Sequence, residues 1–174
     1  TQATEVPVLV VPHPEAGRAH AQNLINTDRV MAITNHITGD DALVNTTMAF
    51  TANQGMCWLT HVENQVVFER YMETISKIPQ VNTDIARETI AAQLLKEPTD
   101  YIAACKTEIG RHKLSVQIKL LVVMGRRIDE YRQLIVDHKI DLLVMHTKTD
   151  DHLAMHGAAY PLAVELRQIP ILMI

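Results

Sequence analysis

The sequence contains little cysteine, and its two thiols do not form a recognisable metal-binding motif. Cys57 and Cys105 lie far apart among 174 residues, and neither belongs to a CxxC pair or a similar ligand pair. A chain of this length buries a sizeable core without help from disulfides or metals. We therefore interpret both residues as reduced, buried thiols of a cytoplasmic protein.

Basic stripes and long apolar runs are also missing. The net charge is −4 and no basic stripe is visible, so nucleic acid is not an expected partner. The sequence has no apolar run of about 18 residues and no signal-peptide pattern at its start. We expect a cytoplasmic protein without direct insertion into a membrane. The chain begins at Thr1 rather than Met, which leaves open that it is a fragment of a longer protein.

Catalytic motifs are absent as well. The sequence has no Gly-x-Ser-x-Gly elbow and no intact Walker loop, and neither cysteine lies in a catalytic motif. His152 could pair with Asp150 or Asp151 for acid–base chemistry, but no nucleophile or substrate pocket is implied beside it. We therefore predict that the protein is not an enzyme.

Apolar, β-branched runs of strand length recur along the chain and predict a sheet. Most are continuous rather than alternating, as expected for strands covered on both faces. They occupy residues 6–11, 30–34, 56–62, 116–124, 141–145 and 170–174. Segments of helical period lie between them, and one places Ile128, Tyr131, Leu134 and Ile135 on a single face. Alternating strands and helices indicate an α/β fold with a doubly wound, mostly parallel sheet.

The longest stretch without a strand runs from residue 65 to residue 112. Pro79 and Pro98 divide it, which predicts three helical pieces. Asn82 or Thr83 is the expected cap of the second piece, and Thr99 the expected cap of the third. The first piece places Phe68, Tyr71, Met72 and Ile75 on one side.

The two ends of the sequence resemble each other. "VPVLVVP" at residues 6–12 is close to "IPILMI" at residues 169–174. One interpretation makes residues 1–12 the last strand of a preceding copy, followed by a linker at 13–29. The other makes them an extra edge strand of this domain. The predicted domains are therefore an N-terminal strand and linker, 1–29, and a main domain, 30–174.

From residue 30 onward the order of elements resembles the universal stress protein family. The resemblance rests on "VMAITNHITGDDALVNTTMAFTA", "GMCWLTHVEN", "VQIKLLVVMGRRIDEYRQLIVDHKIDLLVM" and "GAAYPLAVELRQIPILMI". It implies a five-stranded parallel sheet in the order 3-2-1-4-5 with helices on both faces, plus the extra N-terminal strand here. It also implies a homodimer through the C-terminal strand. Some members bind ATP, and some are fused to transporters.

Compared with the ATP-binding members, the loop after the fourth predicted strand is altered. His146 and Thr149 occupy the first two glycine positions of the phosphate loop, and Gly157 follows two residues too early to match the third. Ala158 stands where a hydroxyl would contact phosphate, and Asn35 replaces the adenine-facing Asp. Asp150 and Asp151 add negative charge near Lys148. These changes argue against ordinary ATP binding.

If the crevice beyond the first and fourth predicted strands does bind a ligand, the sequence allows two kinds, an adenine nucleotide or a metal ion. AMP, or ATP with Mg, would be bound by a set of residues after the first and fourth strands: Asn35, His36, Thr38, His146, Thr147, Lys148, Thr149, Gly157 and Ala158. A zinc or nickel ion would be bound by imidazoles of the same loops: His36, His146, His152 and His156.

We therefore expect a universal stress protein-like regulatory or interaction domain in stress response, with a degenerate nucleotide loop, no catalysis and no tightly bound cofactor. The alternatives are an adenine nucleotide sensor, which could be a cytosolic domain of a transporter, and a metal-responsive module.

Overall fold

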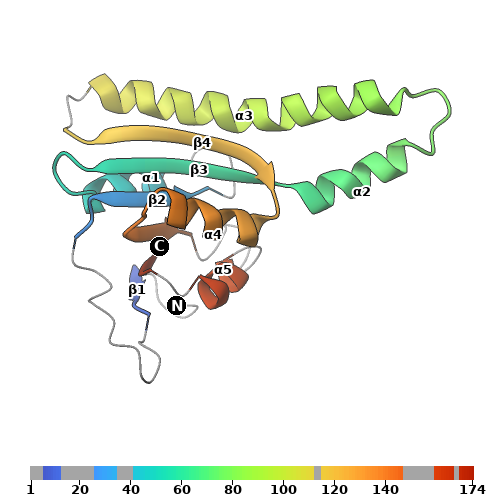
Figure 1. The fold of residues 1–174 in the computed structure, drawn as a ribbon. Coiled ribbons are helices and arrows are strands. Elements are labelled where there is room, and N and C mark those ends of the chain that lie inside the picture. The colour runs from blue at the N-terminus through green and yellow to red at the C-terminus, as the bar shows by residue number, and fades with distance from the viewer. Residues whose placement is uncertain (1–5, 13–25, 35–40, 112–114, 147–158, 167–168) are drawn as a thin grey trace.

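A computed structural model describes residues 6–12, 26–34, 41–111, 115–146, 159–166 and 169–174. The described residues form one six-stranded sheet in the order β1-β6-β5-β2-β3-β4 (Figure 1). Its strands are β1 (Val8–Val10), β2 (Arg29–Ile33), β3 (Met56–Asn64), β4 (Gln117–Gly125), β5 (Leu142–Met145) and β6 (Ile171–Met173). Strands β2 to β6 pair in parallel. The predicted order 3-2-1-4-5 is confirmed, with the extra N-terminal strand at the edge.

The helices cover both faces of the sheet. They are α1 (Asp41–Phe50), α2 (Gln65–Ile75), α3 (Thr83–Arg111), α4 (Arg127–Asp137) and α5 (Ala159–Glu165). Successive strand residues point to opposite faces, so Val30 and Ala32 of β2 join a core under α1 and α3, whereas Met31 and Ile33 join a core under α4 and α5. This alternation explains the continuous apolar runs, because each strand is covered on both sides.

Helix α4 follows the predicted pattern. Tyr131, Leu134 and Ile135 are buried against the sheet, and Ile128 packs partly against the same cluster. The helix faces the sheet because these positions recur at intervals of three and four residues. The amphipathic face predicted from the sequence is confirmed.

The prediction of three helical pieces between residues 65 and 112 is wrong. In the described part of this stretch, residues 65–111, the chain forms two helices, and α3 runs without a break through Pro98. Asn82 caps α3 as expected, since its Oδ1 accepts hydrogen bonds from the N–H groups of Asp84 and Ile85, both at 3.1 Å. Thr99 is not a cap; it lies inside α3, and its hydroxyl donates to the carbonyl of Leu95 at 2.6 Å.

Helix α2 and the first half of α3 form an arm that projects past the end of the sheet (Figure 1). The register explains this geometry: β2 ends at Ile33, paired with Thr60, whereas β3 and β4 continue together to the pair Asn64 and Gly125. Asn64 then caps α2 by accepting hydrogen bonds from Val66 and Val67. The second half of α3 returns over the sheet, where Ile102 is buried. We call residues 65–97 the arm.

Strand β1 lies at the edge of the sheet beside β6, near the marked C-terminus (Figure 1). Its pairing with β6 is antiparallel, with Val8 opposite Met173, Leu9 opposite Leu172 and Val10 opposite Ile171. The division into residues 1–29 and 30–174 stays a prediction. In the described part of the chain, no helix is both long and apolar enough to cross a membrane.

Candidate functional site

The predicted ligand crevice lies beyond the carboxyl ends of β2 and β5. These strands are neighbours, and their last pair is Ile33 with Met145. From β2 the chain leads to β3 on one side, and from β5 it leads to β6 on the other, so strand order reverses between them. Ligands of doubly wound folds bind at this reversal point. The two segments expected to contribute ligands, 35–40 and 147–158, begin here.

Most of the predicted site residues lie outside the described residues. This applies to Asn35, His36, Thr38, Thr147, Lys148, Thr149, Gly157 and Ala158, and to His152 and His156 of the proposed metal set. His146 is described; it is half-buried and directly follows β5. Among the described residues, no group of three His, Cys, Asp or Glu side chains is arranged to hold a metal ion. The nucleotide and metal sets stay predictions.

His61 of β3 is a buried histidine that contacts the backbone just after the end of β2. His61 is 2% exposed, and its Nδ1 lies 3.0 Å from the carbonyl oxygen of Thr34, the residue after β2. Its Nε2 lies 3.3 Å from a carboxylate oxygen of Glu63. The ring therefore ties the first strand of the main domain to the extension of β3.

The backbone next to this histidine has a polar partner of its own. Arg127 Nε donates a hydrogen bond of 3.1 Å to the carbonyl of Val62. Tyr131 of α4 is buried in the core, and burial raises the pKa of its phenol well above the usual value. Tyr131 thus stays neutral and acts as part of the core. The sequence did not reveal this contact, because the Thr34 carbonyl lies 27 residues away and only the pairing of β2 with β3 brings it to His61.

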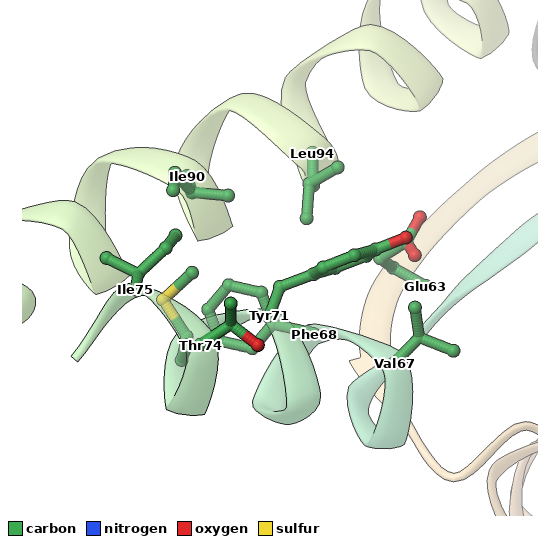
Figure 2. A pocket seen from close by; sticks show the side chains of 9 residues that line it. Glu63, Val67, Phe68, Tyr71, Thr74, Ile75, Ile90 and Leu94 are labelled. Atoms are coloured by element: carbon green, nitrogen blue, oxygen red, sulfur yellow. The ribbon is translucent and has the colours of Figure 1, made fainter. Parts of the chain in front are cut away.

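The arm contains an apolar groove between α2 and α3, with a volume of about 280 Å³ (Figure 2). Its walls are aliphatic and aromatic side chains of both helices, with one carboxylate at an end: Glu63, Val67, Phe68, Tyr71, Met72, Thr74, Ile75, Ile90 and Leu94. The sequence placed four of these residues on one side of a helix. Phe68 and Met72 are buried as that pattern suggests, but Tyr71 is 61% exposed.

One ion pair and one cation–π contact join the two helices of the arm. Arg87 Nη1 lies 2.8 Å from both carboxylate oxygens of Glu69, and its guanidinium lies 5.6 Å from the centre of the Phe68 ring. The salt bridge is half exposed, so its contribution is on the order of 1 kcal/mol or less. The cation–π contact adds a similar amount. The arm is thus joined across one wall while its groove stays open.

Comparison with solved structures identifies the fold. The structure of hypothetical protein MJ0577 aligns with a TM-score of 0.62 and 15% sequence identity, over 85% of this chain and 96% of that chain. The structure of hypothetical protein PH0823 aligns with a TM-score of 0.54 and 15% identity, also over 85% of this chain and 96% of that chain. The chain has a universal stress protein-like fold. No protein family and no curated protein matches the sequence.

The universal stress protein-like resemblance drawn from the sequence is therefore confirmed at the level of fold. At 15% identity the likeness extends no further than the arrangement of strands and helices.

Proposed function

We propose that this chain is a non-catalytic regulatory domain of universal stress protein-like fold that binds other proteins through its arm. The observation that carries the proposal is the apolar groove of about 280 Å³ between α2 and α3. Contiguous apolar surface of this kind on a water-exposed element typically marks a site of protein interaction. Because the arm lies past the end of the sheet, a partner reaches both of its helices without disturbing the core (Figure 1).

The rest of the arm supports the same function. Its two helices and the connection between them expose large apolar side chains: Val66 at 52%, Val67 at 36%, Tyr71 at 61%, Ile78 at 44%, Val81 at 38% and Ile85 at 63%. A partner that covers these side chains gains about 25 cal/mol for each Å² of apolar surface removed from water. An amphipathic helix is the element that fits a groove between two helices.

The chemistry of the described residues supports a function without catalysis. The imidazole of His61 is 2% exposed and has both nitrogens committed to Thr34 and Glu63. The Cys57 thiol is buried, and burial raises its pKa to about 12, so it is not a thiolate at neutral pH. These two groups would be the natural acid–base and nucleophilic candidates, and neither reaches a substrate.

A second candidate function is adenine nucleotide sensing in the crevice. The adjacency of β2 and β5 supports it, since the two strands that precede the predicted ligand segments end side by side at the pair Ile33 and Met145. In this reading the nucleotide would regulate the domain, whether in the cytoplasm or attached to a transporter. A zinc or nickel ion would use the same segments.

One thermal-shift series separates these functions. A ligand present at 100 times its Kd stabilises the native state by about 2.7 kcal/mol. For a chain of 174 residues this raises the Tm by roughly 5–10 °C. We expect no shift with millimolar ATP or AMP plus magnesium, and none with zinc or nickel. A shift with nucleotide would establish the sensor instead, and a zinc shift abolished by His146→Ala would establish the metal-responsive module.

The interaction function has its own test in the groove. We expect an amphipathic helical peptide with leucines at i, i+3, i+4 and i+7 to bind with micromolar affinity in fluorescence anisotropy. Val67→Asp and Ile90→Asp should weaken this binding at least tenfold, because each puts a charge against the apolar wall. Val136→Asp is the matched control, since Val136 is 62% exposed on α4, away from the arm. Equal binding by all three variants would refute a role for the groove.

A further inference from the structure

Among the described residues that line the groove of the arm, one carries a charge. Figure 2 shows the carboxylate of Glu63 at one end of the groove, whereas Ile75 lies at the other end. The other described residues that line it are uncharged. Glu63 belongs to β3, so the charged end is the one next to the sheet. The groove therefore has a direction, with an acidic end and an apolar end.

Two contacts fix the position of this carboxylate. One oxygen of Glu63 lies 3.3 Å from Nε2 of His61, and the other accepts a hydrogen bond of 3.0 Å from the N–H group of Asn64. A carboxylate offers about four acceptor sites on its two oxygens, so these contacts leave sites for a ligand. The side chain is 19% exposed. It therefore presents a fixed, partly buried acceptor to a molecule that enters the groove.

The cationic side chains around this end of the groove have other partners. Arg87 pairs with Glu69, and Lys96 pairs with Asp100. Arg127 of α4 approaches from the opposite face of the sheet and donates to the backbone of β3. Among the described residues, no lysine or arginine forms an ion pair with the carboxylate at the groove. A cation supplied by a bound partner would therefore meet no competitor for this position.

The position of the charge decides which helix the groove prefers. A wholly apolar helix that covers Glu63 removes water from the carboxylate and puts nothing in its place, which weakens binding. A helix that brings a cation to the same point replaces the lost water, and one that brings an acid adds repulsion. The groove therefore discriminates between helices that have the same apolar face.

The length of the groove places the cation on the partner. On α2 the lining residues run from Val67 to Ile75, a rise of about 12 Å. An apolar stripe from i to i+7 of a bound helix covers about 10 Å of this length. The side chain that reaches Glu63 is therefore one turn beyond the stripe on the same face, at i−4 or i+11 according to the direction of the helix.

We propose that the groove selects amphipathic helices with a lysine or arginine one turn beyond the apolar stripe, and that Glu63 is the residue that selects them. The apolar side chains of the partner cover the walls from Val67 to Ile75, and its cation pairs with the Glu63 carboxylate. This inference rests on the proposed function, because it names the kind of partner that the arm binds.

The first test compares two peptides of identical composition on the wild-type chain and needs no variant to fold. Both carry leucines at i, i+3, i+4 and i+7. One has lysines at i−4 and i+11, on the leucine face, and the other has them at i+2 and i+9, on the opposite face. Because both ends carry a lysine, the direction of the bound helix does not affect the comparison.

In fluorescence anisotropy, the peptide with lysines on the leucine face should bind at least tenfold more tightly than its isomer. A third peptide with glutamates at i−4 and i+11 should bind more weakly than either. Equal affinities of the two lysine peptides would overturn the selection by charge and leave the groove as a binding site. Absence of binding by all three peptides would overturn the proposed function as well.

The second test removes the charge of Glu63 while nearly keeping its shape. In Glu63→Gln the affinities of the two lysine peptides should differ by no more than about twofold, because the amide carries no charge. Glu73→Gln is the matched control, since Glu73 lies on the same helix outside the groove, is 72% exposed and pairs with Lys77. This control should keep the tenfold preference. A preference that survives in a folded Glu63→Gln, or one that disappears in Glu73→Gln, would contradict the role of Glu63.

Discussion

The His61 bridge offers the sharpest test of how the structure is held together at the crevice. His61→Ala removes a ring that is 2% exposed and that contacts the Thr34 carbonyl at 3.0 Å and Glu63 at 3.3 Å. The carbonyl then loses its side-chain partner in a buried position, which costs about 1–3 kcal/mol. The vacated ring volume adds roughly 1 kcal/mol, less than the 3–5 kcal/mol known for larger aromatic rings.

Together these effects give a loss of about 2–4 kcal/mol in the free energy of unfolding at pH 7. At 2–4 °C per kcal/mol for a chain of this size, the Tm should fall by roughly 5–15 °C. Urea denaturation followed by circular dichroism measures the free energy directly. Glu63→Gln is the matched control, because its amide oxygen still accepts from the ring, and it should cost less than about 1 kcal/mol. If His61→Ala stays within about 0.5 kcal/mol of the wild type, the bridge does not stabilise the fold and the reasoning fails.

Three further predictions follow from particular residues. Burial raises the pKa of the Cys57 thiol from 9.0 to about 12. The unfolded chain therefore loses this proton at lower pH than the folded chain, and the free energy of unfolding declines as pH rises from 9 towards 12. In urea titrations, Cys57→Ala should make the decline between pH 9.5 and 11 shallower by up to about 1.4 kcal/mol per pH unit. Gly55→Ala would place a Cβ 2.8 Å from the carbonyl oxygens of Ala52 and Asp28 and should destabilise the fold by about 1–3 kcal/mol. At Gly110 in α3 an added Cβ meets no neighbouring atom within 4 Å, so Gly110→Ala should stabilise the fold by about 0.5–1 kcal/mol. Thermal denaturation that ranks the two variants in the opposite order would contradict the packing at Gly55. Pro98 has no N–H group and removes one backbone hydrogen bond from α3. Amides of residues 84–94, in the arm, should therefore exchange hydrogen at least tenfold faster than those of residues 102–109. Uniform exchange along α3 would show that the arm does not open separately.

The strands and α4 could be predicted from the sequence, because the spacing of their apolar residues is also the spacing that packs against the core. The strands of the main domain are continuous apolar runs because both faces are covered, and α4 has its buried face where three- and four-residue spacing predicts it. Order 3-2-1-4-5 came from the family resemblance rather than from periodicity. It could not be derived from local spacing, since strand order depends on contacts between segments distant in sequence.

The failure at Pro98 has a local physical reason. A proline inside a helix removes one hydrogen bond and costs about 3 kcal/mol or more when nothing offsets it. Here each half of α3 has its own partner: the first half packs against α2, and the second half places Ile102 in the core. Pro98 itself is buried. Tertiary contacts on both sides therefore outweigh a breaking signal that local rules treat as decisive.

The candidate site was predicted less well than the fold. The reversal of strand order between β2 and β5 agrees with the topology implied by the resemblance, whereas a ligand site beyond it stays a prediction. The His61 bridge and the groove of the arm were missed, since each depends on side chains that only the tertiary structure brings together. Tyr71 illustrates this: helical spacing assigns it to a covered face, yet α3 covers only part of that face and leaves it 61% exposed.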